Sequence, residues 1–332
     1  MTTKDDGFPK DALDIDPAQE VEKTSQQILD LMAKQLKRRG LVVGISGGID
    51  SSVTAALAVR ALGPKRVVAL EMPERHSADE TLELSGLVAT HLGIEAIHED
   101  ISGILESLGF YRRYNEAVQR VIPEYDESWK SKIVISNVVE KKGYNLFSLV
   151  AQKPDGTETK NRLPIKAYLE IVAATNFKQR TRKMLEYYHA DRLNYAVAGT
   201  PNRLEYDQGF FVKLGDGAAD IKPIAHLYKT QVYALAEYLG LPEEIRKRPP
   251  TTDTYSLPQG QDEFYFSLPY DKMDLCLYAK NHGYSAEAVC FAVGLTPEQV
   301  QRVYDDIDTK RTTTRYLHLT PLLVGDVPEI HF

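Results

Sequence analysis

The stretch Gly44-Ile-Ser-Gly-Gly-Ile-Asp-Ser-Ser52 decides the fold of this chain, because it joins an apolar run to a helical pattern. The run Leu41–Ile45 predicts a buried strand, and the helix that follows the glycines is expected to reach about Leu62. Adjacent glycines let the backbone approach a ligand closely, and the free N–H groups of a beginning helix favour an anion. Serine hydroxyls nearby add donors, so the turn predicts a phosphate site.

Asp50 needs an explanation in such a turn, since a carboxylate repels phosphates unless a cation lies between them. A Mg²⁺ ion resolves the conflict, because it prefers oxygen ligands. The alternative is an ordinary turn with a capping Asp or Ser, but the position directly between a strand and a helix favours a ligand site. The turn has no lysine of the kind found in the GxxxxGK(S/T) loop of kinases and GTPases, so it indicates another class of nucleotide site.

Strands and helices alternate along the first hundred residues. The pattern gives a helix at 18–39, a strand at 66–70, a helix at 77–92 and a short strand at 96–100. Gly40 is expected to end the first helix. This rhythm predicts an α/β fold, a doubly wound parallel sheet with helices on both faces. Residues 1–17 are expected to be a flexible arm, and residues 18–332 a single domain.

Residues 109–165 break the rhythm and predict an insertion, which is either a hairpin or a lid. The insertion holds Trp129, several tyrosines, the apolar stretch Ile133–Ile135 and a turn at Pro154–Gly156. The alternating pattern resumes after it, with a helix from 165 to about 190, a strand at 194–199 and a helix at 230–240. Short helices are expected from Asp271 onward, so the C-terminal part should be helical.

The composition limits what the chain can be. Its 332 residues are 43% hydrophobic and 26% charged, which is typical of a globular protein with a sizeable core. The net charge of -7 argues mildly against a nucleic-acid partner. No apolar run suits a signal peptide or a membrane span, so a cytoplasmic location without membrane contact is expected. The two cysteines, Cys276 and Cys290, show no metal or disulfide spacing.

The turn resembles the SGGxDS pyrophosphate loop of the ATP pyrophosphatase superfamily, whose fold is adenine nucleotide alpha hydrolase-like. Members cleave ATP between its α and β phosphates and leave AMP on a substrate. Further stretches resemble motifs of the NAD synthetases within that superfamily. They are Asn176–Met184, Val197–Glu205, Gly209–Gly217, Asp220–Pro223, Lys229–Ala236 and Lys247–Thr251. The order and spacing of these motifs identify the chain as similar to that family.

The resemblance implies roles for individual residues. Asp50 and Lys229 would be catalytic, and Asp50 together with Glu205 would bind Mg²⁺. ATP would be bound by Gly44, Ile45, Ser46, Gly47, Gly48, Ile49, Asp50, Ser51, Ser52, Thr200, Lys229 and Thr251. The acceptor substrate, deamido-NAD, would be bound by Arg180, Lys213, Asp220 and Lys310.

Some of these residues also fit simpler interpretations. Lys229 opens a predicted helix, where the dipole disfavours a cation, so a lysine there suits a phosphate better than solvent. Arg180 alone fits an ordinary helix surface, and only its motif favours a binding role. Asp216 and Asp220 alone fit loop caps, and the resemblance favours binding for Asp220 more than for Asp216.

The resemblance also implies the reaction. The carboxylate of deamido-NAD would attack the α phosphate of ATP, pyrophosphate would leave, and ammonia would convert the acyl-adenylate into NAD and AMP. No side chain need act as a nucleophile, so catalysis would rest on positioning and on neutralising charge. Glutamine-using NAD synthetases carry an amidase domain with a cysteine nucleophile before this strand. Here only about 40 residues without a cysteine precede it, so the resemblance implies free ammonia, or ammonia from a separate partner, as the nitrogen source. Family members form homodimers through helices near the N-terminus, a role open to residues 18–39.

Several features depart from the family pattern. Residues 109–165 exceed the usual connection, Gln179 replaces an alanine, and Thr309 replaces a histidine that contacts the substrate. Tyr255 adds an unusual aromatic residue to the loop at 251–263. These departures gather where the acceptor would bind, so a ligase that amidates another carboxylate remains an alternative. Two further alternatives are a tRNA-modifying ATP pyrophosphatase, which the acidic net charge opposes, and a non-enzymatic nucleotide sensor.

Overall fold

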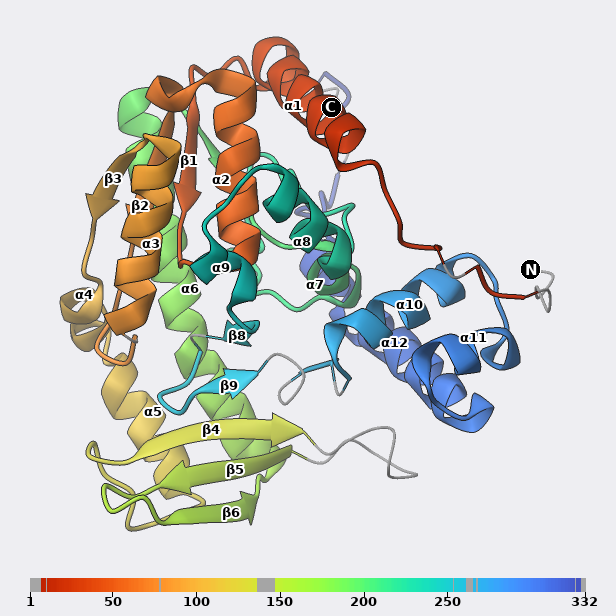
Figure 1. Ribbon diagram of the computed structural model, residues 1–332. Coiled ribbons are helices and arrows are strands. Elements are labelled where there is room, and N and C mark those ends of the chain that lie inside the picture. Colours follow the sequence, from red (N-terminus) through yellow and green to blue (C-terminus); the bar gives the residue numbers. More distant parts are fainter. Residues whose placement is uncertain are drawn as a thin grey trace.

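A parallel sheet flanked by helices forms the upper left part of the molecule in Figure 1. The computed structural model describes residues 7–9, 11–77, 79–135, 147–252, 254–260, 265–266, 268–325 and 327–329. Within these ranges the sheet has four strands in the order β3-β2-β1-β7, and each neighbouring pair is parallel. The strands are β1 (Leu41–Gly44), β2 (Val67–Glu71), β3 (Glu95–His98) and β7 (Ala196–Ala198). Each predicted strand is present, at slightly different bounds.

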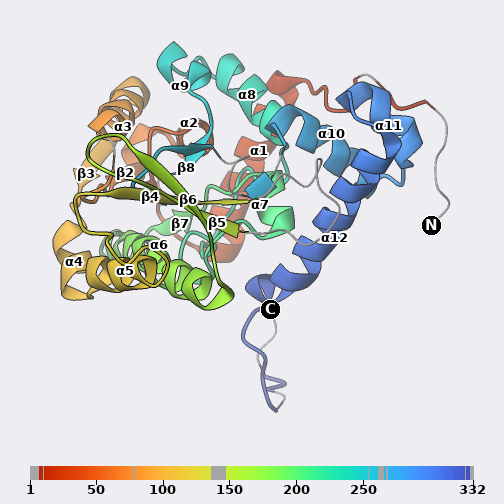
Figure 2. The same cartoon turned by 90° about the horizontal axis from the view of Figure 1, so that it is seen from below.

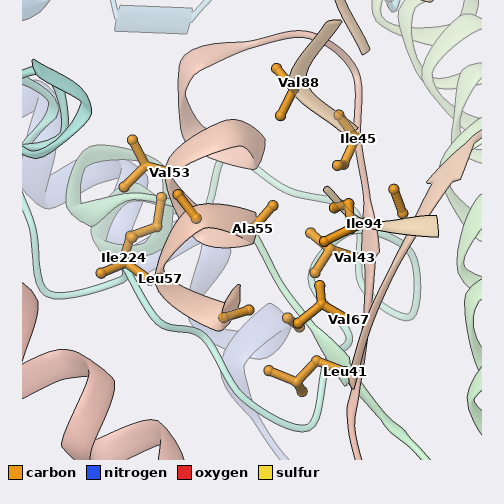
Figure 3. Packing of buried hydrophobic residues seen from close by; sticks show 14 of the residues in the cluster. Leu41, Val43, Ile45, Val53, Ala55, Leu57, Val67, Val88, Ile94 and Ile224 are labelled. Carbon is orange, nitrogen blue, oxygen red and sulfur yellow. The ribbon is translucent and has the colours of Figure 1, made fainter. Parts of the chain in front are cut away.

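Helices cover both faces of this sheet, which confirms the predicted doubly wound fold. On one face lie α1 (Pro17–Asp30), α2 (Ile49–Leu62), α3 (Asp79–Leu92) and α8 (Lys229–Tyr238). On the other lie α4 (Ser102–Ser107), α5 (Phe110–Gln119) and α6 (Ile165–Leu193). Successive strand residues point to opposite faces. Leu41 and Val43 therefore enter the first core (Figure 3), and Val42 enters the second.

The first helix ends differently from the prediction. Its α-helical turns stop at Asp30, a π-helical stretch continues over Leu31–Leu36, and Lys37 takes a left-handed conformation at φ 52°. Gly40 therefore does not close the helix. A Cβ at Gly40 would lie 2.4 Å from the carbonyl oxygen of Arg66, so this glycine permits close packing beside the sheet.

The inserted stretch forms a second, antiparallel sheet (Figures 1 and 2). Its strands are β4 (Lys130–Ile135), β5 (Phe147–Gln152) and β6 (Glu158–Arg162), in that order across the sheet. The predicted turn at Pro154–Gly156 connects β5 to β6, and Gly156 has a φ of 85°. Residues 136–146 lie outside the described residues. Trp129, Ile133 and Leu149 join the core beneath α5 and α6, so this sheet is packed onto the parallel-sheet unit.

The C-terminal part is helical, as predicted, with a core of its own. It comprises α10 (Tyr270–Asn281), α11 (Ala286–Val293) and α12 (Pro297–His318). The last of these has 22 residues, which is longer than the short helices expected. Phe8 and Leu13, from the stretch predicted to be a flexible arm, pack against this core. Residues 1–6 and 10 of that stretch lie outside the described residues. None of the described helices is long and apolar enough to cross a membrane.

Candidate active site

The glycine turn lies at the carboxyl end of β1 and opens a large cavity. Gly47 has a φ of 67°, and a Cβ there would lie 2.6 Å from the Cβ of Leu84, so only glycine fits. Residues Ser46, Gly48, Ile49, Asp50 and Ser51 line a main cavity of about 1280 Å³. Gly44 and Ile45 line a smaller neighbouring cavity of about 220 Å³. The turn therefore presents the start of α2 to the main cavity, the arrangement expected for a phosphate site.

The serines of the turn have different positions. The hydroxyl of Ser51 donates to the carbonyl oxygen of Gly48 at 3.0 Å and lies 3.4 Å from the hydroxyl of Ser46. Both of these serines face the main cavity. Ser52 is fully buried, and its hydroxyl donates to the same Gly48 carbonyl at 2.8 Å. Its side chain braces the turn, whereas Ser46 and Ser51 present oxygens to a ligand.

Asp50 is the centre of a charged cluster. Lys229 opens α8, as predicted, and its Nζ donates a hydrogen bond to Oδ2 of Asp50. Nδ2 of Asn202 donates to the other oxygen, Oδ1, at 3.1 Å. Lys229 is only 1% exposed, so its charge is matched by a carboxylate inside the protein. Hydrogen bonds to Asp50 thus connect residues 202 and 229, which are far from it in the sequence, to the glycine turn.

Glu205 lies in the same cavity, close enough for its charge to act on Asp50. Helix α7 (Arg203–Gln208) begins with a capping box, in which Asn202 accepts from the N–H of Glu205 at 3.2 Å. In return, Oε2 of Glu205 accepts from the N–H of Asn202 at 3.1 Å. Burial, and then the charge of Asp50, raise the pKa of Glu205 to about 8. Burial lowers the pKa of Lys229, but the Asp50 and Glu205 carboxylates outweigh it and leave that pKa raised.

Asp274 of α10 holds Lys229 in place from behind. Its carboxylate caps α8 by accepting from the N–H of Lys229 at 3.2 Å and from that of Thr230 at 2.7 Å. Burial raises the pKa of Asp274 to about 7, and the two N–H groups oppose that rise only in part. The buried carboxyl group of Asp274 therefore fixes the start of α8, from which Lys229 reaches Asp50.

The remaining predicted ATP residues face the main cavity from other elements. Thr200 follows β7 and lines both cavities. Thr251 lines the main cavity from β8 (Thr251–Thr252), which pairs with β9 (Gln259–Gly260). The structure thus brings these threonines to the cavity that the turn opens.

The predicted acceptor residues divide into two groups. Lys310 of α12 lines the main cavity and forms an ion pair with Asp306 at 2.6 Å, while burial lowers its pKa. Arg180, Lys213 and Asp220 lie outside the described lining of both cavities. Nε of Arg180 donates to the carbonyl oxygen of Lys213 at 3.3 Å.

Asp220 has a structural partner instead of a place in the cavity. Its Oδ2 accepts from the N–H of Val197, the middle residue of β7, at 2.7 Å. Asp216, the weaker candidate in the sequence, does line both cavities, and burial raises its pKa. The resemblance favoured Asp220 over Asp216 for substrate binding, whereas in the structure Asp216 lines the cavities and Asp220 does not.

Sequence reasoning assigned no role to two residues that build the site. Asn202 connects Asp50 to the cap of α7, and its position three residues before Glu205 is a recognisable capping signal. Lys178 is 2% exposed, lines the main cavity and forms an ion pair with the buried Glu74 at 2.7 Å. The sequence carries no signal for that pair, because its two residues lie 104 positions apart.

Comparisons with known proteins show the family to which the chain belongs. The family model described as NAD synthase matches residues 20–129 and 121–315. The NH(3)-dependent NAD(+) synthetase of Rhizobium meliloti (strain 1021) is 60% identical over 97% of this chain and 96% of its own length. The solved structure of an NMN synthetase from Francisella tularensis has a TM-score of 0.63 at 23% identity, over 93% of this chain and 100% of that one.

The fold is also that of the NH3-dependent NAD synthetase from Campylobacter jejuni in complex with the nitrate ion. Its TM-score is 0.61 at 23% identity, over 94% of this chain and 100% of the other. The family model covers most of the chain, and the Rhizobium protein is far more than 30% identical over nearly the whole length of both. The chain therefore belongs to the NAD synthase family.

Proposed function

We propose that this chain is an ATP- and Mg²⁺-dependent ligase that converts deamido-NAD, ATP and ammonia into NAD, AMP and pyrophosphate. Membership of the NAD synthase family supports the proposal, as does the 60% identity to an NH(3)-dependent NAD(+) synthetase. The same matches favour amide formation over the tRNA-modifying alternative.

The observation that carries the proposal is the cluster of Asp50, Lys229 and Glu205 beside the glycine turn. In the proposed reaction a carboxylate oxygen of deamido-NAD attacks the α phosphorus, and the bond from that phosphorus to the bridging oxygen breaks. Pyrophosphate leaves with the added charge. The N–H groups at the start of α2 and the ammonium group of Lys229 are the donors available to stabilise that charge.

Ammonia then attacks the acyl carbon, and the carbon–oxygen bond to AMP breaks. This second step needs a site from which water is excluded, because water would return the carboxylate. The cavity walls contributed by Phe147, Tyr168 and Tyr255 are apolar and support such exclusion. No nucleophilic side chain is required at either step.

The residues present fit a Mg²⁺ ion. Asp50 and Glu205 offer hard oxygen ligands. The pKa of Glu205 is raised first by burial and then by the charge of Asp50, and a bound cation would offset both effects. The described residues hold no group of three or more His, Cys, Asp or Glu that could hold a metal ion. Mg²⁺ often uses only one or two carboxylates and completes its shell with water and phosphate oxygens. When bound, it would neutralise phosphate charge in the leaving pyrophosphate.

We infer a homodimer that pairs through α6 instead of α1. Helix α1 buries its apolar side against α2 and α8, with Val21 and Ile28 each 2% exposed. Helix α6 leaves Ile165, Leu169 and Met184 more than half exposed, at spacings that place them on one side. An exposed apolar stripe of this kind supports a protein interface.

Arg180 lies on that same helix, and its Nε donates a hydrogen bond to the carbonyl oxygen of Lys213. A partner copy at α6 would therefore lie beside these two cations, and we expect them to bind the acceptor at this interface. The test compares Met184→Glu with Phe291→Glu, since Phe291 is 94% exposed on the distant α11. We expect sedimentation to show a monomer only for Met184→Glu; a dimer in both variants would contradict the α6 interface.

The activity test is an incubation with deamido-NAD, ATP, Mg²⁺ and ammonium, in which NAD, AMP and pyrophosphate are all measured. We expect equal amounts of the three products. ATP binding without NAD or AMP above background would exclude the proposed reaction. Formation of AMP and an amide from a different carboxylate, but not from deamido-NAD, would favour a ligase with another acceptor. Thr309, which replaces the family histidine, lines the cavity and is compatible with such an acceptor. Binding with no pyrophosphate release from any acceptor would indicate a nucleotide sensor.

A further inference from the structure

The β4 edge of the inserted sheet is covered by a loop that also lines the active-site cavity. Strand β4 pairs with β5 along one edge. On its other edge, the N–H of Ser131 donates to the hydroxyl of Ser256 at 2.9 Å, and the Ser131 carbonyl accepts from the N–H of Leu257 at 3.2 Å. Further along, the side-chain amide of Gln259 donates to the carbonyl oxygen of Ile133. The loop thus satisfies strand groups that would otherwise be left open.

Ser131 is itself held from below. Its hydroxyl lies 2.9 Å from that of Tyr114 on α5 and 3.1 Å from that of Tyr125. Ser131 is fully buried, and Ser256 is the loop residue that meets it. The position of Ser256 is therefore set by a buried network of neutral hydroxyl groups and not by the nucleotide-binding core.

The other side of the same loop faces the proposed nucleotide site. Thr251, Thr254 and Ser256 line the main cavity, and Lys178 anchors the loop by donating to the carbonyl oxygen of Thr254 at 3.1 Å. The β8–β9 pairing ties Thr251 to Gly260 and Thr252 to Gln259. A displacement of Gln259 from β4 would therefore be passed directly to the strand that carries Thr251.

We propose that the inserted sheet is a buttress that holds residues 251–252 and 254–260 against the nucleotide, with Ser131, Ser256 and Gln259 as positioning residues for ATP binding. The inference rests on the proposed function in one respect, that the cavity beside Thr251 binds ATP. The buttress orders the loop before ATP arrives, so binding need not supply that ordering. Without these bonds, part of the binding free energy of ATP would be used to bring the loop into place.

The test is a double variant, Ser256→Ala with Gln259→Leu, which removes both side-chain contacts to β4 and keeps the loop backbone. The matched control is Thr159→Val with Gln152→Leu, which removes a hydroxyl and an amide contact from the β5–β6 side of the same sheet. An ordinary hydrogen bond corresponds to about fivefold in an equilibrium constant, so the loss of two should raise the KM for ATP by about 25-fold in the first variant only. The kcat at saturating ATP should stay within about twofold of wild type, because excess ATP restores the closed loop.

Two further readouts separate positioning from general damage. Hydrogen exchange at the amides of residues 254–260 should accelerate in the loop variant and not in the control, while the Tm of both stays near that of wild type. Calorimetric binding of a non-hydrolysable ATP analogue should weaken by the same factor as the KM, which tests the buttress even if deamido-NAD is not the acceptor. Unchanged analogue affinity despite faster exchange would overturn the proposal, and so would unchanged exchange at these amides.

Discussion

The two sides of the main cavity are built from different kinds of interaction. On the nucleotide side, Lys229 and Asp274 are buried ionisable groups, Asp50 and Glu205 are half-buried, and the pKa values of Glu205, Lys229 and Asp274 are shifted. On the side of the inserted sheet, contacts such as that between Ser131 and Ser256 join neutral hydroxyls and backbone groups. The first side can stabilise charge as it forms in a reaction, whereas the second can only hold shape. Changes on the first side should therefore alter chemistry and pH dependence, and changes on the second should alter binding.

The largest effect is expected from Asp50→Asn, which keeps the size of the side chain and removes its charge. Turnover should fall by at least about a thousandfold, because the metal site and the partner of Lys229 are lost together. The matched control is Asp155→Asn in the β5–β6 turn, where turnover should not change. Steady-state product formation measures both. Equal turnover for Asp50→Asn and wild type would remove the metal role.

A smaller effect is expected from Asn202→Ser. Serine still caps α7, so stability should hold, but the amide donor to Asp50 is lost. Loss of a hydrogen bond to a charged group predicts a fall in kcat of about ten- to a hundredfold. Ser285→Ala removes an ordinary helix cap from α11 and should lower the Tm without affecting kcat. A loss of kcat that only tracks the loss of Tm would contradict the role given to Asn202.

On the charged side, the turn itself was predictable from local pattern, because Ser46–Ser52 joins one strand to one helix. The places of Lys229 and Glu205 were expected only from the family resemblance, and the contacts of Asn202 and Asp274 were not predicted. The inserted side was not predictable in the same way. The contacts of Ser131 with Ser256, 125 positions away, depend on tertiary packing. The sequence of β4 does not indicate which segment covers its edge.

The division of the acceptor residues was also not predictable. Arg180 and Lys213 match family motifs, but a motif does not specify whether a side chain faces its own cavity or a surface shared with a second copy. Asp220 illustrates the same limit, since its carboxylate binds a backbone N–H of the neighbouring strand.

The charged side should also make stability depend on pH through Asp274. Its pKa in the folded protein, about 7, lies above the ordinary value of 3.8, so the folded state holds a proton that the unfolded state releases between those values. The free energy of unfolding should therefore fall as the pH rises from about 4 to about 7, by up to about 1.4 kcal/mol per pH unit, and then level off. Asp274→Asn should lose this contribution. Urea unfolding at several pH values measures it, and parallel curves for variant and wild type would count against it.

The smallest effect is expected from Thr309→His on the acceptor side. The Thr309 hydroxyl donates to the carbonyl oxygen of Asp305 within α12, so it is already engaged although the residue lines the cavity. A histidine could reach further into the cavity and donate one hydrogen bond to the acceptor. The KM for deamido-NAD should therefore fall by a few fold, which corresponds to about one hydrogen bond, while the KM for ATP stays unchanged. An unchanged KM for deamido-NAD would show that the departure from the family histidine does not weaken the contact.

The most direct test of the ligase mechanism follows an oxygen atom. Deamido-NAD labelled with ¹⁸O in its carboxylate is converted in the presence of ATP, Mg²⁺ and ammonium, and the AMP and pyrophosphate are analysed by mass spectrometry. Attack of the carboxylate on the α phosphorus predicts one labelled oxygen in each AMP and none in pyrophosphate. Unlabelled AMP formed together with NAD would contradict the acyl-adenylate and with it the role assigned to the charged cluster.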